Sequence, residues 1–223
     1  MTIDPRLAQA FAPHQTLAAA LLPALPQGDD GAHDMAHLLR VWANARAIQA
    51  AEGGDAELLA AAVLLHDNVA VEKNSPQRAM ASRLAAERGA ALLAAQGWPP
   101  ARCAAAAHAI ASHSFSAGIA PETLEARILQ DADRLDAIGA IGIARCFYTA
   151  GRMGSALYDA ADPRATARPL ADTRFALDHF HTKLLRLAEG FQTAAGQRLA
   201  QARQQRLRRF LDELAEEAGF PPG

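Results

Sequence analysis

Histidine and aspartate residues recur in four short segments of the chain. The segments read GAHDMAHLLRV, LLHDN, HAIASHS and LQDADRLDAIGAIGIAR. They supply His33, Asp34, His37, His66, Asp67, His108, His113, Asp131, Asp133 and Asp136. Imidazole and carboxylate groups together form the ligand set that proteins use for divalent Mn, Fe, Co or Zn. The four segments therefore predict a metal site assembled from distant parts of the chain.

The spacing of these residues indicates how the ligands could meet. His33 and His37 are one helical turn apart, so both lie on one helix face. His66 and Asp67 are adjacent and diverge by about 100° along a helix, so both reach one ion only where the helix ends or in a cleft between helices. Asp133, on a distant helix, could close the site. Two imidazoles and two carboxylates leave positions for water, and a metal ion can convert bound water into a hydroxide nucleophile.

Basic residues follow the candidate ligands in the sequence. Lys73, Arg78 and Arg83 come after the His-Asp pair, and Arg134 and Arg145 come after the acidic cluster. Lysine and arginine offset the negative charge of phosphoryl groups, while a metal ion polarises a phosphoryl oxygen. A metal site beside cationic side chains therefore favours a phosphate ester or anhydride as substrate.

Four blocks in order, GAHDMAHLLRV, LLHDNVAVEKNSPQRAMASRLAA, HAIASHSFS and LQDADRLDAIGAIGIAR, resemble the HD superfamily of metal-dependent phosphohydrolases. The likeness is closest to the bacterial branch of YedJ-like and YpgQ-like proteins, and it runs from about residue 31 to 158. It implies an all-α fold and one metal ion held by His37, His66, Asp67 and Asp133. The superfamily takes its last ligand from an ADxL segment, which here gives Asp133, with Asp131 as the rival.

The resemblance also implies an activity. YpgQ-like relatives act as manganese-dependent pyrophosphatases, so the expected reaction converts a (d)NTP to a (d)NMP and pyrophosphate through a metal-bound hydroxide. Manganese is the expected ion, with Mg, Co, Fe, Ni and Zn as alternatives. Some HD enzymes carry an acidic pair after the motif, but Ala70 and Val71 occupy those positions here, and Glu72 is displaced. Two other functions remain open. One is a phosphomonoesterase or phosphodiesterase on other nucleotides, and the other is a non-catalytic nucleotide- or metal-binding signalling module.

Further residues are candidates for binding the substrate or for catalysis: Lys73, His113, Arg78, Arg134, His33, Asp34, His108 and Asp136. Lys73 is the favoured phosphate contact because it lies on the loop leaving the ligand pair. His113 precedes a loop and suits a phosphate contact or a general acid. Asp34 could instead cap a helix, and His108 could be a core histidine. His108 and His113 also leave a second metal ion conceivable.

The composition limits the class of protein. The chain has 223 residues, 51% of them hydrophobic, and a formal net charge of −2, so neither a nucleic-acid partner nor a membrane surface is expected. The cysteines, Cys103 and Cys146, form no metal-type pair and fit a reducing, cytoplasmic compartment. The N-terminal segment does not read as a signal peptide. The expected partner is a small-molecule nucleotide, and a homodimer stays open.

Alanine dominates the chain and β-branched residues are sparse, which predicts an all-helical fold. Helices are expected at about 7–25, 34–51, 56–66, 76–96, 103–113, 121–152, 173–188 and 191–218. The segment over 121–152 could bend near Gly139 and Gly142. The segment at about 151–169 is the longest irregular piece, and a loop of this length is often functional or mobile. We expect one HD domain over 1–223, with its core at about 26–158 and a C-terminal helical extension at about 170–220.

Overall fold

The computed structural model describes residues 5–26, 35–69, 80–114 and 117–220. Within these ranges the chain is helical and forms no strand; one isolated bridge pairs Ala156 with Phe175. The predicted all-α class is confirmed. The chain divides into two compact units, residues 1–133 and 134–223. The expectation of one HD domain with a C-terminal extension stays a prediction.

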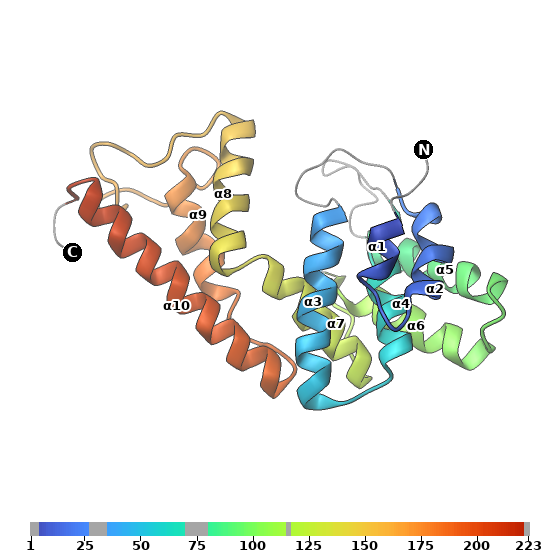
Figure 1. The fold of residues 1–223 in the computed structure, drawn as a ribbon. Coiled ribbons are helices and arrows are strands. Elements are labelled where there is room, and N and C mark those ends of the chain that lie inside the picture. Colours follow the sequence, from blue (N-terminus) through green and yellow to red (C-terminus); the bar gives the residue numbers. More distant parts are fainter. Residues whose placement is uncertain (1–4, 27–34, 70–79, 115–116, 221–223) are drawn as a thin grey trace. The chain divides into compact units, whose positions relative to one another are not determined.

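The first unit consists of helices packed around a central buried one (Figure 1). Its elements are α1 (Pro5–Gln9), α2 (Gln15–Leu21), the 3-10 turn η1 (Leu22–Ala24), α3 (Met35–Glu52), α4 (Ala56–Leu65), α5 (Ala81–Ala95), α6 (Pro100–Ser112) and most of α7 (Leu124–Asp136). Helix α4 packs against α2, α3, α5 and α6. The run from Leu58 to Leu65 is buried throughout, so the hydrophobic effect fixes this helix in the core.

Helix α4 begins at a cap that the sequence predicts. The side chain of Asp55 accepts hydrogen bonds from the backbone N–H groups of Glu57 and Leu58, at 3.0 and 2.9 Å. Arg102 of α6 then binds both Asp55 and Glu57, each at 2.8 Å. The start of α4 is thereby tied to a neighbouring helix, and its other end carries His66 and Asp67.

Three predicted helices are each divided in the structure. The expected helix over 173–188 is divided into α9 (Ala176–Thr182) and the 3-10 turn η4 (Leu184–Arg186). The expected helix over 7–25 is broken into α1, α2 and η1, with Pro13, which has no backbone N–H, between the first two. The expected helix over 121–152 is broken between α7 and α8 (Gly139–Met153). Gly139 has a φ of +72°, a left-handed value that glycine tolerates. A Cβ at Gly142 would collide with the carbonyl of Ala137.

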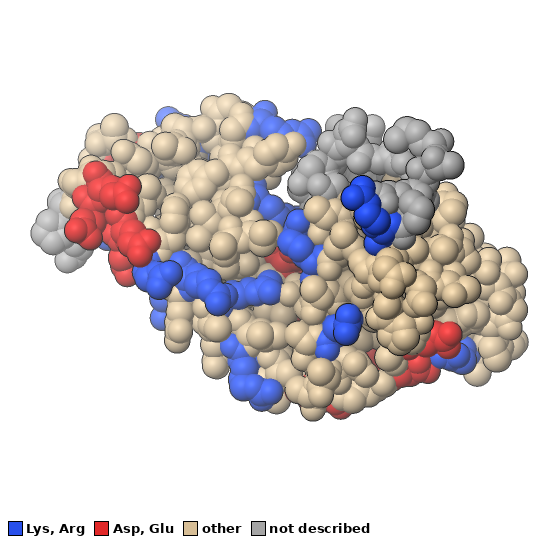
Figure 2. All heavy atoms as spheres, in the orientation of Figure 1, with Lys and Arg blue, Asp and Glu red and all other residues tan. Residues whose placement is uncertain are grey.

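The second unit contains α8, α9 (Ala176–Thr182), the 3-10 turn η4 (Leu184–Arg186) and α10 (Ala194–Glu217). The rings of Phe147, Phe180 and Phe210 meet in its interior, with centroids 5.8–6.0 Å apart. Helix α10 exposes a basic stretch and then an acidic stretch (Figure 2): Arg206, Arg208 and Arg209, followed by Asp212, Glu213, Glu216 and Glu217. These charged side chains form an exposed face of the helix.

The irregular segment from 154 to 175 is held by ion pairs and by side-chain hydrogen bonds to its backbone. Arg168 donates to both carboxylate oxygens of Asp178, at 2.6 and 2.9 Å. Asp162 accepts from the backbone N–H groups of Thr166 and Ala167, at 2.9 and 2.8 Å. The two bonds to Asp162 satisfy backbone N–H groups that have no helix or strand partner. Whether residues 151–169 act as a lid stays a prediction.

No helix among the described residues combines the length and the hydropathy needed to cross a membrane. The cytoplasmic location stays a prediction.

Candidate metal centre

The apolar run of α4 ends on His66, which closes the helix. Its Nδ1 lies 2.7 Å from the carbonyl oxygen of Val63, one turn earlier. A carbonyl only accepts, so Nδ1 carries the proton of the neutral ring and Nε2 carries the lone pair. The side chain is 1% exposed, so the ring is held in one orientation. An imidazole fixed in this way presents Nε2 as a metal ligand.

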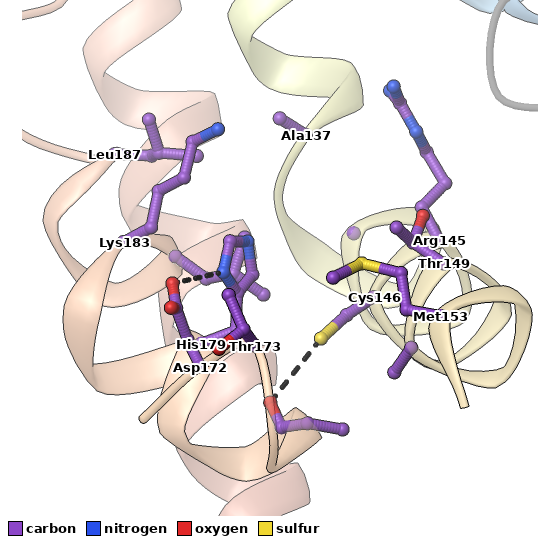
Figure 3. A pocket seen from close by; sticks show the side chains of 14 residues that line it. Ala137, Arg145, Cys146, Thr149, Met153, Asp172, Thr173, His179, Lys183 and Leu187 are labelled. Atoms are coloured by element: carbon purple, nitrogen blue, oxygen red, sulfur yellow. Dashed lines mark hydrogen bonds and ion pairs between the residues drawn. The ribbon is translucent and has the colours of Figure 1, made fainter. Parts of the chain in front are cut away.

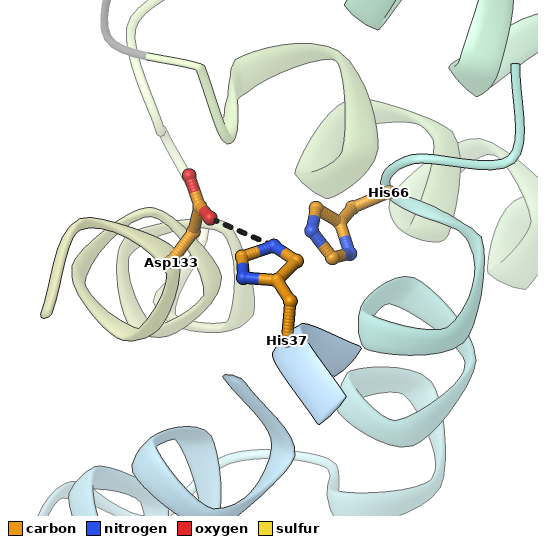
Figure 4. A group of neighbouring side chains, drawn as sticks. All are labelled: His37, His66 and Asp133. Carbon is orange, nitrogen blue, oxygen red and sulfur yellow. Dashed lines mark ion pairs between the residues drawn. The ribbon is translucent and has the colours of Figure 1, made fainter. Parts of the chain in front are cut away.

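Three side chains from separate elements meet beside this ring (Figure 4). His37 comes from the first turn of α3, His66 follows α4, and Asp133 lies in the last turn of α7. One ligand atom from each lies within 4.8 Å of the other two. His37 Nε2 is 3.5 Å from an oxygen of Asp133. Both histidines are buried, while Asp133 is partly exposed.

Asp67 adds a second carboxylate. Its Oδ2 lies 3.8 Å from His37 Nε2 and 3.6 Å from His66 Nε2, and its side chain is 45% exposed. These separations exceed a hydrogen bond, for which about 2.7–3.2 Å is usual. Ligand atoms that each lie about 2.1 Å from one ion are roughly 3.0–3.5 Å apart. The donor types and spacing fit a divalent cation, so the group of His37, His66 and Asp133 could hold a metal ion.

His113 borders the same group. Its Nδ1 lies 2.6 Å from the carbonyl oxygen of Ile110, which repeats the arrangement at His66. Its Nε2 is 3.8 Å from Asp67, and its ring meets that of His66 edge to face at 5.0 Å. Burial lowers the pKa of His113, and the His66 imidazole lowers it further. The neutral ring therefore turns an acceptor nitrogen toward Asp67.

Two buried amides that sequence reasoning missed hold the surrounding helices. Asn44 of α3 donates from Nδ2 to the carbonyl of Ala132 at 3.0 Å, directly before Asp133. Gln130 of α7 donates from Nε2 to the carbonyl of Ser112 at 2.7 Å, directly before His113. Asn44 lies seven residues after His37, hence two turns along the same helix face. That spacing is the one signal in the sequence that could have indicated Asn44.

The residue that follows His66 and Asp67 is also held in place by hydrogen bonds. Asn68 is fully buried and donates from Nδ2 to the carbonyl of Ala85 at 3.0 Å. Arg88 donates to the carbonyl of Asn68 and to that of Ala24, both at 2.8 Å. These bonds connect the end of α4 to α5 and to η1.

The remaining predicted site residues fall in different places. Four of them lie outside the described residues: His33, Asp34, Lys73 and Arg78. His108 accepts a hydrogen bond at Nε2 from the backbone N–H of Glu122, at 3.0 Å. Asp131, the rival ligand, is buried at 1% exposure and is not a member of the three-residue group, which contains Asp133.

Arg134 and Asp136 make contacts within the second unit. Arg134 donates to the carbonyls of Leu187 and Glu189, at 2.9 and 2.7 Å. The buried Asp136 pairs with Arg145 at 3.0 Å. Their suggested roles toward substrate stay predictions.

Comparison with known proteins agrees with this geometry. Residues 35–138 match the HD domain family. YpgQ of Bacillus subtilis is 31% identical over 193 residues, which cover 85% of this chain and 86% of YpgQ. The crystal structure of a HD-superfamily hydrolase from Bacillus thuringiensis is 27% identical, with a TM-score of 0.68 over 97% of this chain and 98% of that one. The crystal structure of YpgQ in complex with ADP is 30% identical, with a TM-score of 0.68 over 90% and 96%.

The resemblance seen in the four sequence blocks is thereby confirmed. The chain belongs to the HD superfamily of hydrolases.

Proposed function

We propose that this hydrolase is a divalent-metal-dependent phosphohydrolase acting on nucleotides, and that it converts a (d)NTP to a (d)NMP and pyrophosphate. The observation that carries the proposal is the meeting of His37, His66 and Asp133, with the carboxylate of Asp67 facing both imidazoles. We assign these four side chains as the ligands of one ion, with manganese first. When bound, the ion supplies a Lewis acid that polarises a phosphoryl oxygen and acidifies water.

The chain's own residues prepare this site. The hydrogen bond from His66 to Val63 fixes the ring that faces the ion. His113, whose Nδ1 proton is used by Ile110, turns an acceptor nitrogen toward Asp67. We therefore assign His113 to orient water or accept its proton, in place of the general acid that the sequence suggested.

A nucleotide substrate is supported by the solved complex of YpgQ with ADP. The phosphate contacts proposed for this chain are Lys73 and Arg78, because they follow the His-Asp pair in sequence. Cationic groups at this point would offset the charge of a polyphosphate.

The test is a substrate panel with Mn²⁺: nucleoside triphosphates, nucleoside monophosphates and cyclic dinucleotides, assayed for pyrophosphate and for inorganic phosphate. Wild type is compared with Asp67→Ala and with Asp212→Ala, an exposed carboxylate of α10. We expect pyrophosphate from wild type and Asp212→Ala, and none from Asp67→Ala. Equal activity in all three proteins would refute the assignment.

Two other results would select the alternative functions. Inorganic phosphate released from the nucleoside monophosphates, with no pyrophosphate from the triphosphates, would indicate a phosphomonoesterase. Metal binding with no turnover of any substrate, in any metal, would indicate a binding module.

A further inference from the structure

The second unit contains a cavity that is lined by none of the proposed metal ligands. It has a volume of about 330 Å³. One wall is formed by α8 and the other, here called the α9 side, by residues between 172 and 187 (Figure 3). All residues that line it belong to 134–223. Sites for small organic ligands have volumes of about 300–1,000 Å³. The cavity therefore has the size of a site for a nucleotide-sized molecule.

The α9 side of the cavity carries an oriented histidine. His179 Nδ1 lies 3.2 Å from Asp172 Oδ2, and the hydroxyl of Thr182 donates to the same oxygen at 3.0 Å. The hydrogen bond from His179 lowers the pKa of Asp172, and the one from Thr182 lowers it further. Asp172 is therefore ionised at neutral pH and accepts only, so Nδ1 of His179 carries a proton. The ring is held at the wall of the cavity by this pair.

Lys183 supplies a positive charge beside this ring. In Figure 3 the side chain of Lys183 extends toward the part of the cavity beside Ala137, and the ring of His179 lies below its amino group. Within the described part of the chain, Lys183 forms no ion pair, whereas Arg145 at the other side of the cavity is paired with Asp136 at 3.0 Å. An exposed ammonium group at the wall of a cavity favours an anionic ligand, and phosphate is a common partner of lysine.

The α8 side of the cavity is mostly apolar. Met153 turns its thioether toward His179, and Cys146 lies behind it (Figure 3). The thiol of Cys146 donates to the carbonyl of Ala176 at 3.5 Å, and burial raises its pKa to about 11. Cys146 is thus a neutral part of the wall and no nucleophile. An apolar wall opposite a cation suits a ligand with one organic end and one charged end.

We propose that this cavity binds a small organic phosphate of nucleotide size, with its phosphate at Lys183 and His179 and its organic part against Met153 and Cys146. Because all these residues lie in the second unit, binding requires no metal ion. The inference is independent of the proposed hydrolysis.

The methionines of the chain provide the test. Of its four methionines, Met153 alone lies in the second unit, where it lines the cavity, and Met35 lies two residues before His37. The full chain is labelled with ¹³C-methyl methionine, and the signals are assigned with Met→Leu variants. AMP and ADP are titrated in the presence of EDTA, with adenosine and inorganic phosphate as separate probes.

We expect the Met153 signal to shift and saturate with AMP or ADP, and adenosine to bind at least tenfold more weakly. Lys183→Ala should weaken AMP binding by about tenfold or more, because it removes a charge-assisted contact. Arg186→Ala, an exposed cation of η4 outside the cavity wall, should leave binding unchanged.

Four results would overturn the proposal. One is a Met153 signal that does not move at millimolar AMP. Another is equal binding of AMP and adenosine, and the third is a Lys183→Ala variant that binds as wild type does. Shifts confined to Met35 would place the ligand in the first unit and likewise refute the cavity. None of these readouts depends on turnover, so they are separate from the test of hydrolysis.

Discussion

The pair of Arg168 and Asp178 ties the irregular segment of the second unit to α9. Asp178 is almost fully buried, with 2% of its side chain exposed, and Arg168 contacts both of its oxygens. The backbone N–H of Ala171 donates to the same carboxylate at 2.7 Å. Removing the guanidinium would leave a buried carboxylate with one neutral donor. Leaving a carboxylate without its charged partner in this way costs about 1–3 kcal/mol.

We predict this loss for Arg168→Met at neutral pH. Methionine retains an unbranched side chain over the ring of Phe175, where the guanidinium carbon of Arg168 lies 4.5 Å from the ring centroid. The free energy of unfolding is measured from urea titrations followed by far-UV circular dichroism. Arg186→Met, at an exposed position, serves as the control and should change it by no more than about 0.5 kcal/mol.

The loss should also depend on pH. The hydrogen bond from Arg168 lowers the pKa of Asp178. The pair therefore stabilises the wild type fully above the unfolded pKa of about 3.9, and this contribution is lost as pH falls through the lower folded value. The deficit of Arg168→Met should accordingly be largest near neutral pH and shrink below about pH 4.

A second substitution separates the charge effect from packing. Asp178→Asn placed in the Arg168→Met background removes the buried charge, so it should recover part of the lost stability. The reasoning fails if Arg168→Met costs less than about 1 kcal/mol, or if neither low pH nor Asp178→Asn reduces the deficit.

Three further predictions concern the first unit. Asn44→Leu removes the donor to Ala132 and should weaken Mn²⁺ binding by about 10–100-fold, measured by isothermal titration calorimetry; wild-type affinity would contradict the positioning role. Gly89→Ala places a Cβ 2.8 Å from Cδ1 of Ile110, so we expect a loss of about 1–3 kcal/mol in a urea titration, and unchanged stability would show that Ile110 moves aside freely. Chelating a metal held at 100 times its Kd should lower the stability of this unit by about 2.7 kcal/mol. Tryptophan fluorescence reports that change because both tryptophans lie in the first unit, and a transition insensitive to EDTA would speak against the metal centre.

Much of the fold could be predicted where local signals agree. The α4 helix was expected over 56–66 and spans Ala56–Leu65, because Asp55 caps its start and an unbroken apolar run follows. The break between α7 and α8 was expected only as a bend near Gly139 and Gly142, since both halves have helical periodicity and glycine alone does not end a helix. A Cβ at Gly139 would lie 3.1 Å from Cγ of Arg203, a residue of α10. Such a contact with a residue 64 positions later leaves no local trace in the sequence.

The candidate site was likewise predictable where a local sequence signal exists, and not where a contact joins distant segments. The order of the motifs was enough to predict the imidazoles and carboxylates of the ligand group. The structure brings His37, His66, Asp67 and Asp133 together. The amide of Asn44 was missed because its hydrogen bond to Ala132 joins helices that are far apart in sequence.

The hydrogen bond between His66 and Val63 limits which residues could replace this histidine during evolution. The ring both ends α4, by donating to one of its last carbonyls, and presents its other nitrogen to the ligand group. Aspartate, glutamate or cysteine could also bind a metal, but an ionised carboxylate or thiolate has no proton to donate to Val63. A change of ligand type here would disturb the helix end at the same time. Drift toward a different metal preference is therefore easier at Asp67 or Asp133 than at His66.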